Sequence, residues 1–278
     1  MPDYEGLYAC PLCLKLFGVE AVHSGELTRD HTPPESLGGK LEVLTCKTCN
    51  NESGHRLEDE MLAEERFFEV LGADMGKRMT MKVTSWGETL NADVQIAGNS
   101  ILIFGDPKRN HPEAHKRVMD RMGEAFENGS ANSKFDFTFN FREPNRRMAS
   151  VGWLKSAYLL MFAAFGYNYI FSSELEPVRR QLMDIESEVL PVLGLVSPEK
   201  LDRKIVLIDE PASCRSIFVM MGSRHGIFLP RDGDEHLHER LRQDSALQNG
   251  TLGHFSGRGE IPWPTRTTFL FDREEIPV

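Results

Sequence analysis

The stretch that decides the fold is residues 27–51, which read LTRDHTPPESLGGKLEVLTCKTCNN. Leu27 to Thr32 is predicted to be a strand, and the proline that follows keeps its end extended. Leu41 to Leu44 is a second short strand, and the prolines and glycines between the strands predict a loop. From about Asn50 to Leu71 apolar residues recur at helical spacing. The order is therefore strand, loop, strand, helix.

Two CxxC pairs, Cys10/Cys13 and Cys46/Cys49, flank this stretch, with 32 residues between them. Paired CxxC knuckles place four thiolates at tetrahedral corners, the closed geometry of structural zinc. A segment so short and turn-rich lacks a core of its own, so zinc binding is expected to be part of its folding free energy. An iron–sulfur cluster and redox pairs are the alternatives, which the wide gap and the short knuckles disfavour. The fifth cysteine, Cys214, is expected to be a buried core thiol.

A second motif lies between and after the knuckles. Asp30-His31-Thr32-Pro33 ends the first strand, Gly38-Gly39 follows, and Cys46-Lys47-Thr48-Cys49-Asn50 opens the helix. This pattern resembles the HNH (ββα-metal) endonuclease family, in particular its four-cysteine zinc subgroup, which includes phage junction-resolving nucleases. The resemblance covers residues 8–56. It implies that His31 is a general base, that Asp30 is a metal ligand, and that Asn50 is the second protein ligand of the same ion.

The chemistry of phosphodiester hydrolysis asks for these residue types. It needs a base that removes a proton from water and a cation that stabilises the charged phosphate. Histidine titrates near neutral pH, and carboxylate and amide oxygens suit Mg²⁺ or Mn²⁺. Each residue also has a structural interpretation, since Asp30 can cap a turn, His31 can be a packed polar residue and Asn50 can cap the helix.

His55 follows Asn50 by five residues, about 140° around an ideal helix. This separation disfavours a metal ion shared by Asn50 and His55. Because the HNH resemblance implies that this helix can carry a further ligand, His55 is still a candidate for contact with metal or phosphate, with a plain surface role as the alternative. One departure from the family pattern concerns the asparagine that gives HNH its middle letter and that normally stands shortly before the second CxxC pair. Here residues 40–44 read KLEVL and contain no asparagine. The loop before the second strand must then be held in another way, or the domain is inactive.

Charge argues against a broad nucleic-acid-coating surface. The net charge is −10, and in residues 1–75 six Lys or Arg stand against fifteen Asp or Glu, a net charge of −9. A bound divalent metal would supply positive charge where a phosphate must lie.

Residues 1–72 are predicted to be the HNH nuclease domain and residues 77–278 an α+β domain for sensing, substrate selection or oligomerisation. The fold class is therefore α+β, a small zinc-stapled ββα-metal domain followed by short antiparallel strands and several helices. The predicted strands are Met79–Trp86, Leu90–Ile96, Ser100–Phe104, Lys134–Phe141, Lys204–Ile208, Ser216–Met221 and Gly226–Leu229. The predicted helices are His111–Glu127, Met148–Tyr167 and Glu174–Leu193.

The expected activity is metal-dependent endonucleolytic cleavage, with structural Zn²⁺ and catalytic Mg²⁺ or Mn²⁺. DNA is favoured over RNA as partner, and an effector of phage defence or of a mobile element is the expected setting. The longest apolar run, Ala157 to Gly166, is too short for a membrane span, and the N-terminus carries no secretory signal, so a cytoplasmic location is expected. Residues 77–278 are also a candidate region for self-association or for binding of an activating partner. The alternative function is a catalytically inactive, zinc-stabilised module that binds nucleic acid or protein.

Overall fold

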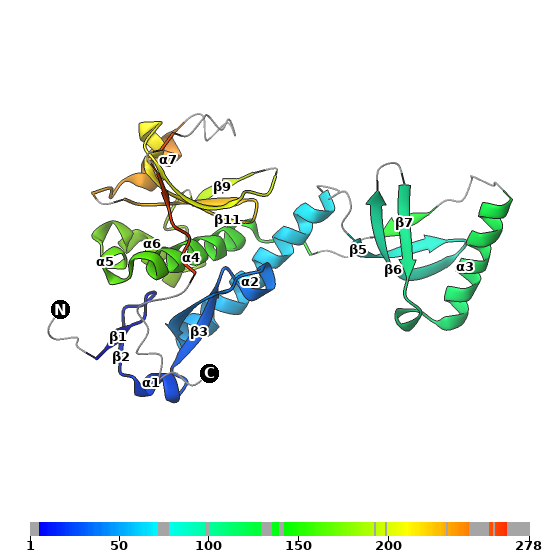
Figure 1. Ribbon diagram of the computed structural model, residues 1–278, viewed down its shortest axis with the longest axis horizontal. Coiled ribbons are helices and arrows are strands. Elements are labelled where there is room, and N and C mark those ends of the chain that lie inside the picture. The colour runs from blue at the N-terminus through cyan, green and yellow to red at the C-terminus, as the bar shows by residue number, and fades with distance from the viewer. Residues whose placement is uncertain are drawn as a thin grey trace. The chain divides into compact units, whose positions relative to one another are not determined.

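The computed structural model describes residues 6–71, 78–97, 100–128, 135–138, 142–191, 193–197, 199–231, 233–244, 256–257 and 259–265. The fold is mixed α+β, as predicted (Figure 1). The chain divides into two compact units, a first unit of residues 1–65 with 144–278 and a second unit of residues 66–143. This grouping differs from the predicted division near residues 72–77. The reason is that the chain after residue 144 returns to the core of the N-terminal segment.

The first unit begins with a small hairpin and the predicted ββα arrangement. Strands β3 and β4 pair antiparallel, with Leu27 opposite Cys46 and Thr32 opposite Leu41. The bounds of this part are β1 (Tyr8–Ala9), β2 (Leu16–Phe17), α1 (Glu20–His23), β3 (Leu27–Thr32), the 3-10 helix η2 (Glu35–Leu37), β4 (Leu41–Cys46) and α2 (Lys47–Leu71). The strand β4 runs two residues further than predicted, and the helix α2 starts three residues earlier.

The Gly-Gly pair of the predicted loop has a steric reason. Gly38 ends η2 with φ of 80°, in the left-handed region that glycine adopts most readily. A Cβ atom on Gly39 would lie 1.5 Å from the Pro33 carbonyl oxygen. The turn that returns the chain from β3 to β4 therefore requires glycine at residue 39.

Helix α4 (Arg146–Phe165) is the central packing element, as the apolar run predicts. The Asn145 side chain caps it by accepting a hydrogen bond from the Met148 amide, and the chain turns away at Gly166. The uninterrupted apolar run Ala157 to Gly166 is shorter than a membrane span, but the whole helix is long and apolar enough to cross a membrane by length and composition alone. However, 83% of its most apolar stretch is buried inside the protein, as in the core helix of a globular domain.

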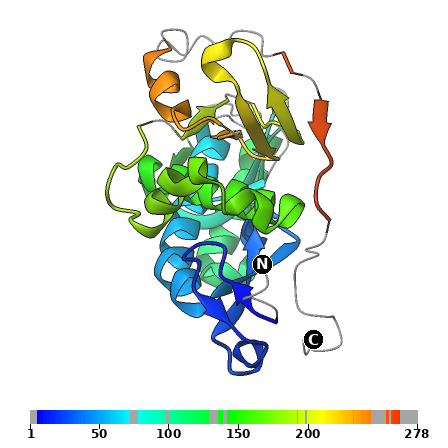
Figure 2. The same cartoon turned by 90° about the vertical axis from the view of Figure 1, so that its left-hand side faces the viewer.

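Helix α4 lies between the ββα segment and a larger sheet, as both ribbon views show (Figures 1 and 2). A Cβ atom on Gly152 would lie 2.4 Å from the Met61 sulfur, so glycine lets α4 approach α2 closely. The His225 ring of β12 stacks on Trp153 of α4 at 5.2 Å, and its Nε2 lies 3.0 Å from the carboxylate of Glu64 in α2. These contacts join α2, α4 and the sheet in one core.

The larger sheet has the strand order β13-β10-β11-β12-β9, and each neighbouring pair is antiparallel. The predicted strands over residues 204–208, 216–221 and 226–229 are confirmed. The bounds after α4 are α5 (Tyr167–Ile170), η4 (Ser173–Leu175), α6 (Glu176–Met183), β9 (Gly194–Val196), β10 (Arg203–Ile208), η5 (Ala212–Cys214), β11 (Ser216–Met221), β12 (His225–Leu229), α7 (Leu237–Gln243) and β13 (Gly259–Ile261). Cys214 is buried, as predicted.

The predicted helix Glu174–Leu193 is wrong beyond Met183, where α6 ends. The cause is the fully buried Gln181 side chain. Its amide nitrogen, Nε2, donates to the carbonyl oxygens of Asp184 and Ser187, and its Oε1 accepts from the Val189 and Leu190 amides. One side chain thus satisfies backbone groups that a continuing helix would have paired with one another.

The second unit contains the predicted antiparallel meander in the strand order β7-β6-β5-β8. Its bounds are β5 (Arg78–Ser85), β6 (Glu88–Ala97), β7 (Ser100–Gly105), η3 (Pro107–Arg109), α3 (Pro112–Glu127) and β8 (Asp136–Thr138). Met81, Val83, Ala92 and Val94 form its own buried cluster. Of the predicted strand over residues 134–141, residues 134 and 139–141 lie outside the described part of the chain.

Candidate metal centre and adjoining pocket

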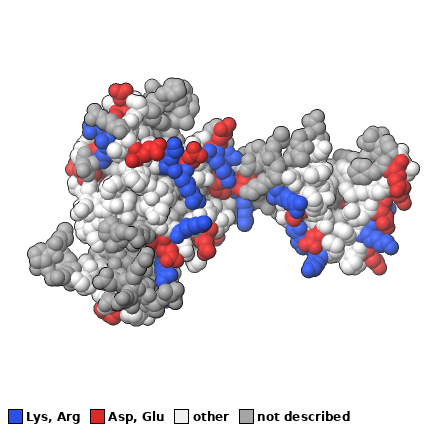
Figure 3. All heavy atoms as spheres, in the orientation of Figure 1, with Lys and Arg blue, Asp and Glu red and all other residues white. Residues whose placement is uncertain are grey.

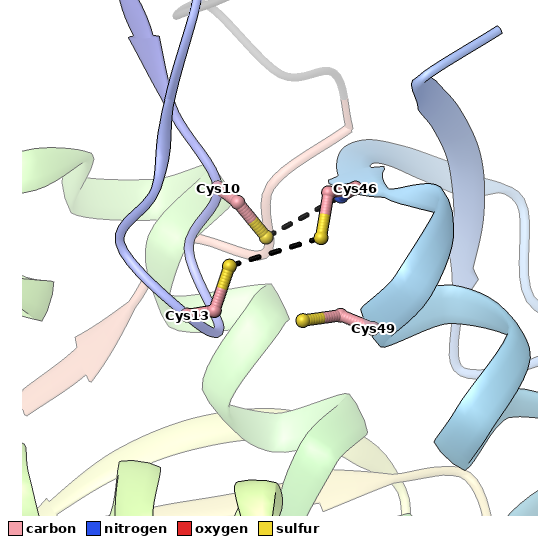
Figure 4. A group of neighbouring side chains, drawn as sticks. All are labelled: Cys10, Cys13, Cys46 and Cys49. Carbon is pink, nitrogen blue, oxygen red and sulfur yellow. Dashed lines mark hydrogen bonds between the residues drawn. The ribbon is translucent and has the colours of Figure 1, made fainter.

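The four predicted cysteine ligands come together from two places in the fold (Figure 4). Cys10 and Cys13 lie in the turn between β1 and β2, whereas Cys46 ends β4 and Cys49 lies in the first turn of α2. Their sulfur atoms all lie within 4.8 Å of one another. The Sγ atoms of Cys13 and Cys46 are 3.7 Å apart. The group joins the N-terminal hairpin to the junction of strand and helix.

The backbone of the first CxxC pair forms a tight, hydrogen-bonded turn. The Leu14 amide donates to the Cys10 carbonyl at 2.8 Å, and the Cys10 amide donates to the Lys15 carbonyl at 2.9 Å. This tight turn places Leu14 at φ of 59°, which is uncommon for a residue with a side chain. The Cys46 amide donates to the Cys10 Sγ at 3.3 Å, a contact that stabilises negative charge on sulfur.

The crowding of the thiols shows why a cation fits there. A hydrogen bond from Cys49 is the main cause that lowers the pKa of Cys10 to about 5, and the same bond raises the pKa of Cys49. Burial raises the pKa of Cys13 to about 11. Thiolates bound to zinc at about 2.3 Å lie about 3.8 Å apart in a tetrahedron. The observed spacing and the donor set therefore fit a structural Zn²⁺ ion, which stabilises all four thiolates together.

Tyrosine hydroxyls fasten the cysteine cluster to the rest of the first unit. Tyr158 of α4 donates to the Pro11 carbonyl at 2.8 Å, and Tyr8 donates to the Leu44 carbonyl at 2.7 Å. Tyr167 donates to the Ala9 carbonyl at 3.1 Å and accepts from the Ala9 amide at 2.9 Å. The centre is thus held on α4 and is not an isolated appendage.

A pocket of about 260 Å³ adjoins this centre on the ββα segment. Asp30, His31, Asn50 and His55 all line it, so the structure brings every predicted nuclease residue to one cavity. The other lining residues are Arg29, Pro34, Glu35, Asn51, Gly54, Leu57, Glu58, Met61, Gly152, Lys155, Ser156 and Leu159. Part of the wall therefore comes from α4, more than 90 residues further along the chain.

Asp30 is held by a lysine that the sequence analysis does not single out. Its Oδ2 lies 2.6 Å from Lys155 Nζ, and the Asp30 and Lys155 side chains are only 11% and 9% exposed. The Thr45 hydroxyl also approaches Oδ2, at 3.4 Å. A buried ion pair of this kind leaves neither charge uncompensated.

His31 lies opposite Glu42 in the register of β3 and β4. Its Nε2 is 3.4 Å from Glu42 Oε1, and Glu42 Oε2 is 3.3 Å from Arg29 Nη1. A carboxylate beside an imidazole can orient the ring.

Asn50 does not cap the helix, because α2 already begins at Lys47. Its Nδ2 donates to the Thr28 hydroxyl at 3.0 Å and to the Arg29 carbonyl at 3.3 Å. Both donor bonds hold the amide nitrogen against β3, so Oδ1 is the atom of this side chain that could bind a ligand. A Cβ atom on Gly54 would lie 3.3 Å from that oxygen, so a glycine there keeps its surroundings open.

His55 is exposed at the rim of the pocket. Among the residues that the structure describes, the four cysteines are the single close group of three or more His, Cys, Asp or Glu side chains. Asp30 and Asn50 carry hard oxygen atoms, the ligand type that Mg²⁺ and Mn²⁺ prefer.

The loop that lacks the middle asparagine is held by other contacts. The Ser36 hydroxyl donates to Glu58 at 2.5 Å, and Arg203 Nη2 donates to the Gly38 carbonyl at 3.0 Å. The Thr32 hydroxyl donates to the Ser156 carbonyl of α4 at 2.7 Å. These bonds connect the loop to α2, to the larger sheet and to α4.

The sequence carries one signal for the missed residue Lys155. It is a single charge in the middle of an otherwise apolar helix, and a buried lysine requires a partner. Glu42 carries no such signal, because an acidic residue on a short strand is common on a protein surface. On the face shown in Figure 3, acidic and basic side chains of the described residues are interspersed and form no broad basic surface there.

The chain matches no protein-family model, no curated protein and no solved structure.

Proposed function

We propose that this protein is a metal-dependent endonuclease of the HNH (ββα-metal) type that hydrolyses DNA phosphodiester bonds. The observation that carries the proposal is the meeting of Asp30, His31 and Asn50 at one pocket beside the cysteine cluster. A structural scaffold alone would not need a carboxylate, an imidazole and an amide oxygen in that order around a cavity.

Each residue has a chemical role in this proposal. His31 removes a proton from the attacking water, and Glu42 at 3.4 Å orients the imidazole. Asp30 and the Asn50 Oδ1 would hold Mg²⁺ or Mn²⁺ together with water molecules. Such an ion would supply positive charge for the phosphate and for the leaving oxygen. The four cysteines hold Zn²⁺ and keep β3, β4 and α2 in place around the pocket.

The first experiment incubates supercoiled plasmid with Mg²⁺ or Mn²⁺ and compares the wild-type protein with His31→Ala. His23→Ala is the matched control, because His23 is an exposed histidine of α1 that does not line the pocket. We expect the wild type and His23→Ala to nick or linearise the plasmid, and His31→Ala to lose at least about a hundredfold in rate. Zinc content is expected to be equal in all three proteins.

Undiminished cleavage by His31→Ala would show that His31 is not the general base. A parallel reaction on single-stranded RNA decides between DNA and RNA as substrate.

A non-catalytic binding module is the second candidate, and one observation favours it. Lys155 compensates the charge of Asp30 without any metal ion. Absence of cleavage by all three proteins with zinc bound, together with retention of plasmid in a gel-shift measurement, would support this candidate.

A further inference from the structure

Lys155 lies in the middle of α4 among buried neighbours, and its Nζ is 2.6 Å from Asp30 Oδ2. The two side chains are 9% and 11% exposed, so little water shares the contact. Burying a lysine costs free energy unless it is paired, and a strongly apolar helix is an unfavourable place for one. The pocket therefore contains a resident cation as part of its wall.

Asp30 meets this cation through one oxygen. Within the described residues, the contacts from Lys155 and Thr45 both go to Oδ2. The other oxygen of Asp30, Oδ1, could therefore bind a further ligand in the pocket that Asp30 and Asn50 both line. The ammonium group thereby fixes the rotation of the carboxylate.

From this arrangement, and resting on the proposed nuclease function, we propose that Lys155 is a positioning residue that neutralises Asp30 in the metal-free protein and weakens binding of a divalent metal until a nucleic-acid phosphate arrives. A divalent ion on Oδ1 would share one carboxylate with the ammonium, and the two cations repel each other strongly in a partly buried site. A phosphate between them relieves that repulsion, because its oxygens contact both cations. Metal and substrate then bind cooperatively.

The test measures Mn²⁺ binding by electron paramagnetic resonance, in a His31→Ala background that does not cleave. Lys155→Met removes the charge and keeps a side chain of similar length. We expect it to bind Mn²⁺ about tenfold tighter or more when no DNA is present. A short DNA duplex is expected to tighten Mn²⁺ binding in the Lys155-containing protein and to have much less effect in Lys155→Met.

Three further variants make the result specific. Lys155→Arg keeps the charge and should bind Mn²⁺ as weakly as the Lys155-containing protein. Lys200→Met removes an exposed lysine of the same unit and should leave the affinity unchanged. Asp30→Asn should abolish the binding. If Lys155→Met does not fold, Lys155→Gln, which can still donate to Asp30, takes its place, with zinc content and circular dichroism as the check of folding.

Equal or weaker Mn²⁺ binding by a folded neutral variant would overturn the inference. If plasmid cleavage nevertheless depends on His31, the proposed function stands and only the role of Lys155 falls. If Mn²⁺ does not bind to any of the proteins, the inference and the proposed catalytic metal site fail together.

Discussion

Single polar side chains decide how the chain turns after α4. Gln181 binds the backbone of residues 184–190 from inside, and Glu174 ties the start of α6 to a distant loop. The Glu174 carboxylate accepts from the Gly233 amide at 2.7 Å and from the Ser172 hydroxyl. The bond from Gly233 to Glu174 joins residues 59 positions apart in the sequence, so no local pattern predicts it.

Glu174 makes stability depend on pH in acid. A hydrogen bond from Ser172, followed by backbone amides, lowers the pKa of Glu174 from 4.5 to about 2. A lowered pKa means that the carboxylate stabilises the fold fully above pH 4.5 and that this contribution is lost as the pH falls toward 2. Glu174→Gln is therefore expected to lower the free energy of unfolding by about 1 kcal/mol at neutral pH, with allowance for solvent screening.

Urea unfolding at several pH values checks this expectation. The difference between wild type and Glu174→Gln should shrink below pH 4.5 and vanish near pH 2. Glu199→Gln, at an exposed position, is the control and should show little difference throughout. A constant difference from neutral pH to acid would contradict the assigned role.

At the scale of elements, the cysteine cluster lies where the hairpin of β1 and β2, whose Tyr8 and Leu12 are buried in the main core, meets the junction of β4 and α2. The second knuckle spans the point where β4 becomes α2, so a metal ion bound by the four cysteines would fix the hairpin, the strand and the helix together. The pocket depends on the same strand and helix, since Asp30 lies on the partner strand β3 and Asn50 on α2.

Cys46→Ser is expected to lose zinc and to lower the free energy of unfolding by more than about 4 kcal/mol, as for loss of a structural metal. Cys214→Ser is the matched control, a buried cysteine outside the cluster, and should keep one equivalent of zinc. Hydrogen exchange should show the loss of protection in Cys46→Ser first over residues 8–17 and 44–56. Full zinc retention by Cys46→Ser would disprove the four-cysteine assignment.

At the scale of the molecule, the second unit is inserted between α2 and α4 of the first. The first unit closes without it, because the Asn145 amide donates to the Glu60 carboxylate at 2.7 Å and α4 packs between the ββα segment and the larger sheet. The second unit has its own buried cluster around Met81 and Val94. The two units therefore have separate cores.

Replacement of residues 67–142 by a short Gly-Ser linker is expected to leave a folded first unit with one zinc ion. The helix α2 at Glu60 already lies beside the start of α4, so the linker has a short distance to cover. Zinc content and a cooperative thermal transition are the measurements. An aggregated or zinc-free product would mean that the first unit needs the second to fold.

The sequence by itself determined the elements whose signals are local. Paired CxxC spacing indicated the cysteine cluster, and period and turn residues indicated β3, β4, α2, α4 and the meander of the second unit. The same local order placed Asp30, His31 and Asn50 as candidates around one helix start. For these features the physical cause lies within a few residues of the feature itself.

Only the tertiary structure decided what surrounds those candidates. Lys155 reaches Asp30 from a helix that follows an inserted unit, and Glu42 reaches His31 through the register of two strands. The return of residues 144–278 to the N-terminal core also lies outside local patterns. Long-range packing of apolar faces and pairing of buried charges select these contacts, and both depend on which segments meet once the whole chain has folded.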